Sequence, residues 1–68
     1  MIRLKVKEIA EARGLNMAQL ARKADIDIRT VRRIYRDPMG EISTTVLDKL
    51  AIALNVDPSA LIEHTSDE

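Results

Sequence analysis

A chain of 68 residues, 46% of them apolar, has room for one hydrophobic core, so we expect a single domain over residues 1–68. The absence of cysteine excludes disulfide bonds, thiolate zinc sites and cysteine catalysis. Only two glycines, two prolines and one aromatic residue are present, so tight turns are few and the core must be aliphatic. This composition predicts an all-α fold.

The charge of the chain is unevenly distributed, although the formal net charge is zero. Residues 1–36 contain ten basic and four acidic residues, a balance of +6. Residues 37–68 contain one basic and seven acidic residues, a balance of −6. We therefore expect an electropositive face with an acidic reverse side.

No segment predicts a membrane span. The longest apolar run, residues 50–54, is far shorter than the roughly 20 residues that cross a bilayer. Residues 1–7 lack the apolar stretch of a signal peptide. We therefore expect a cytoplasmic protein that does not contact membranes.

The first segment carries two patterns. Residues 2–6 alternate between apolar and basic side chains, which is typical of a strand, whereas residues 6–13 follow helical spacing up to Gly14. We expect a helix over about residues 6–13. Residues 2–5 are then either a short edge strand or an extension of that helix.

Two further helices are indicated by their capping residues. Asn16, with Gln19 three residues later, forms a capping box that predicts a helix over about 17–24. Asp27 caps a third helix over about 28–36, which ends before Pro38. The connection between these two helices is so short that it must be a sharp turn, and Asp25 tolerates the left-handed backbone needed there.

The fourth helix has the clearest apolar repeat. Leucine and alanine at positions 47, 50, 51 and 54 follow helical spacing, and Ser43 is a suitable cap, so we expect a helix over about 43–54 that ends at Asn55. Asp57 and Pro58 then open a last short helix through about Ile62. Residues 64–68 are expected to fray.

The third helix carries the strongest functional signal. Its four arginines follow the spacing i, i+3, i+4 and i+7, so they share one face, and the helix contains no acidic residue. A solvated face usually mixes both signs of charge, as residues 7–13 do. An unmixed arginine face instead favours binding to phosphate or to guanine edges.

The segment GLNMAQLARKADIDIRTVRRI, residues 14–34, resembles the Cro/CI-type helix-turn-helix family, also called XRE. The run LDKLAIALNV, residues 47–56, matches the closing pattern of that family, and the resemblance covers about residues 4–62. It implies a compact lambda-repressor-like bundle of four or five helices with a helix-turn-helix motif over about 16–36. The third helix would enter the DNA major groove.

The resemblance also implies which positions face DNA. They lie at the start of the second helix and along the third, and they are Met17, Asp27, Ile28, Arg29, Arg32, Arg33 and Arg36. Family members often have glutamine at position 17. Met17 and Ile28 are therefore apolar groups on the expected DNA side, where they either pack against thymine methyls or mark a protein-binding surface.

Other positions receive weaker assignments. Arg36 is expected to reach phosphate rather than bases, and Arg3, Lys5 and Arg13 are either phosphate contacts or solvated. Tyr35 stands where the family often has glutamate, and we expect it to pack. His64 is the only histidine, so it lacks partners for a metal site or a catalytic relay.

These observations predict a transcriptional regulator that binds double-stranded DNA sequence-specifically as a homodimer on a near-palindromic operator, with no cofactor and no enzymatic activity. The dimer contact would use Leu61 or Ile62 of the last helix, or the N-terminal strand paired with its two-fold mate. The alternative is an antitoxin-like or antirepressor-like module that holds a protein partner on the same scaffold.

Overall fold

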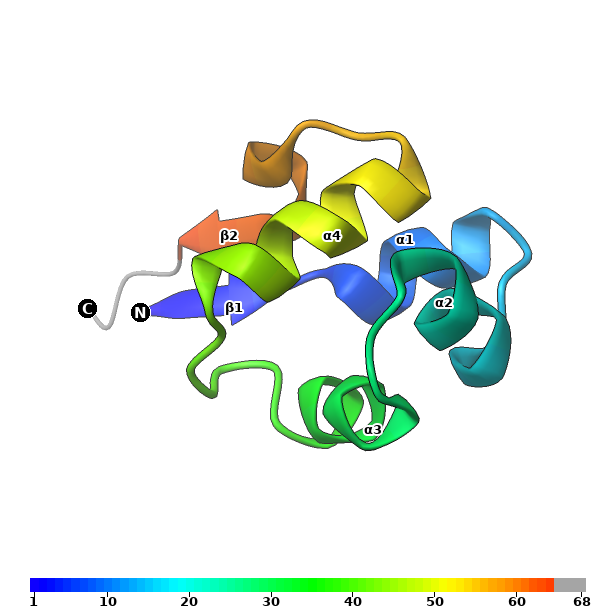
Figure 1. Cartoon of the computed structure of the whole chain (residues 1–68). Coiled ribbons are helices and arrows are strands. Elements are labelled where there is room, and N and C mark those ends of the chain that lie inside the picture. Colours follow the sequence, from blue (N-terminus) through cyan, green and yellow to red (C-terminus); the bar gives the residue numbers. More distant parts are fainter. Residues whose placement is uncertain (65–68) are drawn as a thin grey trace.

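The computed structural model describes residues 1–64 and places a two-stranded sheet at one end of a small helical bundle (Figure 1). The elements in chain order are β1 (Ile2–Leu4), α1 (Val6–Ala12), α2 (Met17–Ala24), α3 (Ile28–Arg36), α4 (Thr44–Leu54), the 3₁₀ helix η1 (Pro58–Leu61) and β2 (Ile62–His64). The fold is therefore the predicted all-α bundle, and residues 2–4 form a strand rather than a helix extension.

The core is aliphatic, as the composition predicts. It is built by one face of each helix together with Leu4 of β1, and no polar or charged side chain among the described residues is buried. The largest fully buried side chains are Leu20, Ile34, Leu50, Leu54, Leu61, Val6 and Val31. Each of them stabilises the fold by roughly 1.5–3 kcal/mol through burial. Because α2 packs against both α3 and α4, the core holds α3 in a fixed orientation.

The predicted caps are confirmed. The Asn16 side chain accepts a hydrogen bond from the Gln19 backbone N–H at 2.8 Å, and the Gln19 side chain accepts one from the Asn16 N–H at 2.9 Å. Ser43 accepts a hydrogen bond from the Val46 N–H at 3.1 Å. Asp25 has the expected left-handed backbone, with φ of 58°. The second, third and fourth helices consequently lie within one residue of their predicted bounds.

The end of the chain differs from the prediction. The expected helix through Ile62 is a 3₁₀ helix that ends at Leu61, and residues 62–64 form the strand β2. This strand pairs antiparallel with β1, in the register Ile2 with His64, residue 3 with 63, and residue 4 with 62. The prediction that residue 64 frays is therefore wrong, and residues 65–68 lie outside the described part of the chain.

Some of the residues expected at a dimer contact have partners within the chain. The β1 strand pairs with β2 along one edge. At the other edge, the Leu4 backbone N–H donates to the Pro38 carbonyl at 2.7 Å. Leu61 is completely buried and is unable to reach a partner, whereas Ile62 is partly exposed.

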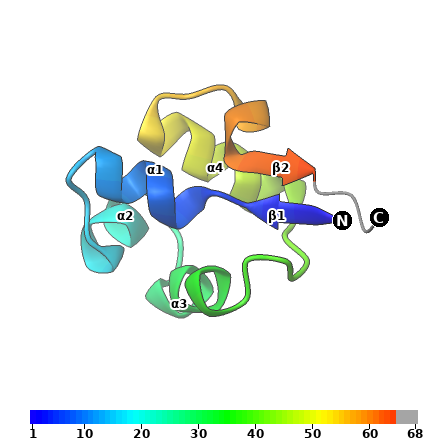
Figure 2. The same cartoon turned by 180° about the vertical axis from the view of Figure 1, so that it is seen from behind.

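The bundle separates α3 from the elements at the end of the chain. Seen from the front and from behind, α3 lies on one side of the molecule and α4 with η1 on the other (Figures 1 and 2). Within residues 1–64, no helix has both the length and the apolar content needed to cross a membrane.

Candidate nucleic-acid interface

The outer face of α3 presents three exposed arginines. Arg29, Arg32 and Arg36 are exposed, while Val31 and Ile34 on the opposite face are buried in the core. The side chain of Arg29 keeps 84% of its surface accessible. With no acid in the helix, these guanidinium groups form a basic face that is able to approach a polyanion without rearrangement of the core.

Asp27 organises the start of this face. Its carboxylate caps α3 by accepting the Arg29 backbone N–H at 2.8 Å, and it also accepts Arg29 Nη2 at 3.0 Å and Nε at 3.3 Å. The hydrogen bonds from the side chain and the backbone of Arg29 hold the pKa of Asp27 below its usual range. Asp27 thus stays ionised and orients Arg29 at the first turn of α3.

Arg33 is directed differently from the other three arginines. It is half-buried, and its Nη2 donates to the Glu41 carbonyl in the loop that follows α3. A Cβ added to Gly40 would lie 2.8 Å from Arg33 Nη1 and 2.7 Å from Asp37 Oδ2. Gly40 therefore leaves the space that the guanidinium occupies. The spacing along the sequence predicts that Arg32 and Arg33 both face DNA. Only the contact between Arg33 and the loop distinguishes the two arginines.

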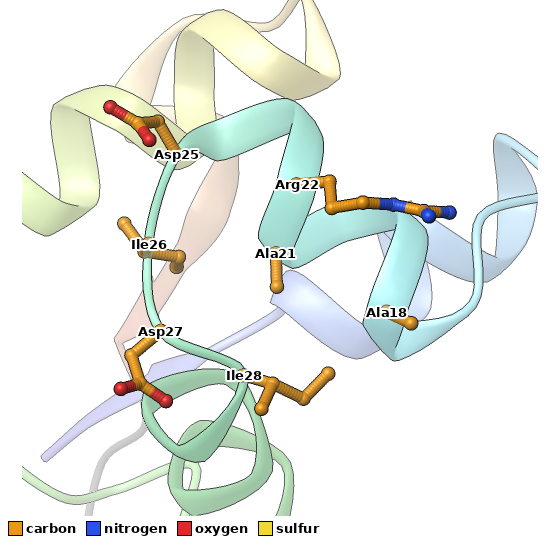
Figure 3. Close-up of a pocket in the computed structure, with 7 residues that line it drawn as sticks. All are labelled: Ala18, Ala21, Arg22, Asp25, Ile26, Asp27 and Ile28. Carbon is orange, nitrogen blue, oxygen red and sulfur yellow. The ribbon is translucent and has the colours of Figure 1, made fainter.

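A cleft of about 670 Å³ lies between α2 and α3 at the helix-turn-helix connection (Figure 3). The small side chains of Ala18 and Ala21 and the larger side chain of Ile28 line the gap between the two helices (Figure 3). Ile28 is half-buried and packs against the core as well. It therefore presents only part of its surface to an approaching ligand.

Met17 does not share this cleft with Ile28. It is 36% exposed at the first position of α2 and lines a separate depression together with Tyr35. The two apolar positions that the sequence places on the DNA side therefore border different hollows. Met17 extends the candidate surface toward α1, and Ile28 belongs to the turn.

Tyr35 packs against the core, as predicted. Burial, and to a smaller extent the nearby Glu11 carboxylate, raises the pKa of its phenol. Its hydroxyl oxygen is buried and has no hydrogen-bond partner among the described residues. The ring thus supports the position of α3 from the side facing α1.

Two of the three weaker phosphate candidates bond to other parts of the chain. Arg3 forms ion pairs with Glu8 and with Glu63, the latter at 3.3 Å, and so joins β1 to α1 and β2. Arg13 Nε donates to the Leu54 carbonyl at 3.0 Å and satisfies the end of α4. Lys5 is half-buried between β1 and α1.

The acidic residues are only partly on the reverse side. Asp48 and Glu63 belong to α4 and β2, which lie away from α3 (Figures 1 and 2). Asp37 and Glu41, by contrast, belong to the loop that directly follows α3. In residues 1–64, no cluster of histidine and carboxylate side chains is arranged to hold a metal ion.

Comparison with known proteins agrees with this geometry. The family model described as the Cro/C1-type HTH DNA-binding domain matches residues 5–67. That span includes α2, the turn and α3. No curated protein matches the chain as a relative.

Proposed function

The chain belongs to the Cro/C1-type HTH DNA-binding domain family, and from this we propose that it is a transcriptional regulator that reads duplex DNA sequence-specifically in the major groove through α3. The observation that carries the proposal is the exposed arginine face of α3, formed by Arg29, Arg32 and Arg36 on a helix without acidic residues. We further propose that the protein acts in the cytoplasm, without a cofactor or enzymatic activity.

The residues of the proposed interface divide by the contacts available to them. Arg32 reads base edges, because its guanidinium is exposed near the middle of the helix and a bidentate contact to guanine suits it. Arg36, one turn later, binds phosphate. Met17 and Ile28 pack against thymine methyl groups at the edge of the surface.

Arg29 and Arg33 reach DNA only after each gives up a hydrogen bond within the chain, whereas Asp27 contributes by capping α3. Arg29 reaches DNA by exchanging its bond to Asp27 for a phosphate or base contact, which leaves Asp27 to cap α3. Arg33 reaches DNA only by leaving the Glu41 carbonyl. We therefore expect Arg33 to contribute less than Arg32.

One copy of so small a domain makes few base contacts, and each bidentate contact discriminates against a wrong base by only about 1–3 kcal/mol. We propose that two copies bind a near-palindromic operator, with half-sites roughly 10 base pairs apart. Neutralisation of three to five phosphates by each subunit, an order-of-magnitude expectation, gives a log–log slope of affinity against salt of about −5 to −9.

The test is selection of binding sites from random duplex DNA at about 150 mM salt. The proposal expects a two-fold symmetric motif, and it expects Arg32→Ala to lose that preference while circular dichroism shows an intact fold. A folded protein that enriches no motif, with a flat salt response, would contradict it.

The second candidate function is an antitoxin-like or antirepressor-like module that binds a protein. The exposed Met17 favours it, because an apolar side chain replaces the polar one common at that position in the family. Under this alternative, DNA binding is weak and does not respond to substitution of Arg32 or Arg33, whereas Met17→Gln weakens capture of the protein partner.

A further inference from the structure

Arg33 is withdrawn from the arginine face of α3 by the loop that follows the helix, residues 37–43. Along α3 it lies one turn from Arg29 and from Arg36, at the spacings that place all three on one side of the helix. Its neighbours are exposed, whereas Arg33 is half-buried and its Nη2 donates to the Glu41 carbonyl. One of the four cations of the helix is therefore held against the chain itself.

The loop keeps its place without help from Arg33. The Pro38 carbonyl accepts the Leu4 backbone N–H at 2.7 Å, which ties the loop to β1, and Ile42 packs against the core. The loop thus runs from α3 past the sheet to α4 with an anchor on each side of Glu41 (Figure 1). The carbonyl that binds Arg33 is presented by a backbone that is fixed independently.

Gly40 supplies the space in which the guanidinium lies. Its backbone does not require glycine, because its φ lies outside the left-handed region, whereas Gly14 has φ of 73°. A Cβ on Gly40 would lie 2.8 Å from Arg33 Nη1 and 2.7 Å from Asp37 Oδ2. Both atoms are at the ends of flexible side chains, so Gly40→Ala moves these side chains and not the backbone.

We propose that this contact is autoinhibitory: the loop and DNA compete for the Arg33 guanidinium, and Gly40 sets the balance between them. The inference rests on the proposed function, in which Arg33 reaches DNA only by leaving the Glu41 carbonyl. It adds a positioning residue outside the helix-turn-helix motif. Gly40 acts on DNA binding through Arg33.

The charges on the two sides explain why the contact forms and why DNA displaces it. Without DNA, a released Arg33 would stand beside Arg29 and Arg36 on a helix that has no acidic residue, and like charges at these spacings repel. The loop carbonyl is a neutral acceptor, whereas a phosphate is ionised and frequently binds arginine through two hydrogen bonds. DNA is therefore the preferred partner, but each binding event must first break the loop contact. A chain without that contact should bind DNA more tightly.

The test is fluorescence anisotropy of Gly40→Ala with an operator selected by the wild type. We expect Gly40→Ala to bind roughly 2-fold to 10-fold more tightly, the ratio that corresponds to the net value of one hydrogen bond. In an Arg33→Ala background, Gly40→Ala should change the affinity no further. Wild-type or weaker binding by Gly40→Ala overturns the proposal. An equal gain in the Arg33→Ala background also overturns it, because the effect would then come from the displaced Asp37.

The other glycine of the chain gives a matched control. An added Cβ at Gly14 meets nothing within 4 Å, and the positive φ there strains any other side chain. Gly14→Ala should therefore lower stability without moving an arginine, and its affinity for the operator should equal that of the wild type. Circular dichroism checks that both variants are folded. Tighter binding by Gly14→Ala would attribute the gain to lower stability and overturn the proposal.

A measurement on the wild type avoids the glycine substitution. The side-chain N–H signals of Arg33 in an NMR spectrum, assigned by comparison with Arg33→Lys, should shift when the operator is added, because the guanidinium changes its acceptor. Arg33 signals that stay in place while those of Arg32 shift would show that the loop contact persists on DNA, which overturns the exchange.

Salt and sequence show where the released arginine binds. One added phosphate contact makes the log–log slope of affinity against salt steeper by about 0.9. One added base contact gives Gly40→Ala a preference for guanine at a position where the wild type has none. Either change supports the exchange, and a tighter variant with neither change contradicts it.

Failure of this inference and failure of the proposed function are distinguishable. A folded wild type that selects no DNA motif removes the proposed function. A wild type that selects a motif, with Gly40→Ala no tighter than the wild type, removes only the autoinhibitory contact and keeps the reading of DNA by α3.

Discussion

The turn between α2 and α3 and the turn between α4 and η1 have the same backbone conformation but lead to different structures. Asp25 has φ 58° and ψ 49°, and Asn55 has φ 56° and ψ 48°. In both turns an aliphatic residue follows, Ile26 or Val56, and its N–H donates at 3.0 Å to a carbonyl of the preceding helix. Both are left-handed helix ends of the kind that satisfies the last carbonyls of a helix.

The residues after the two turns also match at first. Asp27 accepts the backbone N–H of the residue two positions later at 2.8 Å, and Asp57 does the same at 2.9 Å. The structures then diverge. The first turn opens a nine-residue helix with an arginine face, whereas the second opens four residues of 3₁₀ helix that pass into β2.

This difference shows that the left-handed residue and the aspartate cap determine the turn itself. The residues after the turn determine which structure follows it. Arginines occupy the outward positions of α3, whereas Pro58–Leu61 contain no charged residue. The second turn therefore completes the core and returns the chain to the sheet. The first turn leads into α3, whose outward positions carry exposed arginines.

The largest expected effect is on DNA binding by α3, the helix that follows the first turn. We expect Arg32→Ala to weaken binding to a selected operator about 10-fold to 100-fold, because one bidentate contact is worth about 1–3 kcal/mol. Fluorescence anisotropy with labelled duplex DNA measures the change. Arg3→Ala is the matched control, since it removes the same charge from the sheet, where Arg3 bonds to Glu8 and Glu63. Equal losses in both variants would show that affinity follows net charge and not the face of α3.

The second prediction tests whether the two turns are equivalent in stability. Asp25→Val and Asn55→Val place a β-branched residue in a left-handed backbone, which costs roughly 1–2 kcal/mol of unfolding free energy. We expect equal losses in urea denaturation, and we expect Asp25→Gly and Asn55→Gly to remove the strain. A larger loss at position 25 would show that the two turns differ in stability, and the cause would not be the Lys49 contact, because the Asp25 backbone carbonyl that accepts Lys49 Nζ at 3.4 Å is kept in the variant.

The third prediction concerns the end of α3, which lacks this type of turn. Asp37 has φ −131°, and the loop is held instead by Arg33 on the Glu41 carbonyl beside Gly40. Gly40→Ala should displace both the Asp37 carboxylate and the Arg33 guanidinium, which the added Cβ would approach to 2.7 and 2.8 Å, so it and Arg33→Ala should each cost about 1 kcal/mol, the usual net value of a hydrogen bond. The double variant should then lose little more than either single variant. Additive losses in urea denaturation would show that the two residues act independently.

The sequence predicts well the features that depend on neighbouring residues. Asn16 with Gln19, the left-handed Asp25 and the Asp27 cap act within a few positions, so α2, the turn and α3 were predicted with their observed bounds. The same holds for the cap at Ser43.

The remaining features depend on distant parts of the chain. β2 is three residues long and forms by pairing with β1 at the other end of the chain, so its own composition gives little signal. The orientation of Arg33 depends on where the loop through Gly40 folds back. Gly40, shortly after the end of α3, is the only local feature of the sequence that indicates space for the Arg33 guanidinium. The strand register, which brings Ile2 and Ile62 to one face of the sheet, likewise depends on residues at opposite ends of the described chain.

The smallest expected effect distinguishes the two aspartate caps. Hydrogen bonds from the side chain and then the backbone of Arg29 lower the pKa of Asp27, and the backbone N–H and then the hydroxyl of Ser59 lower that of Asp57. A folded pKa below the unfolded value of about 3.9 stabilises the protein above that pH, and this contribution is lost as the pH falls through the folded pKa. Asn also caps helices but does not titrate, so Asp27→Asn and Asp57→Asn should each reduce the fall in Tm between pH 7 and strongly acidic solution.

Salt separates the two contributions further. Asp27 is partly stabilised by its ion pair with the exposed Arg29, whereas Ser59, the hydrogen-bond partner of Asp57, carries no charge. Because salt screens exposed charges, the effect of Asp27→Asn on the pH dependence of Tm should shrink in about 1 M NaCl, while that of Asp57→Asn should persist. Persistence of the effect at both positions would mean that the cap hydrogen bond, and not the charge of Arg29, governs the titration of Asp27. The functional turn would then differ from the structural one only in the arginines that point outward.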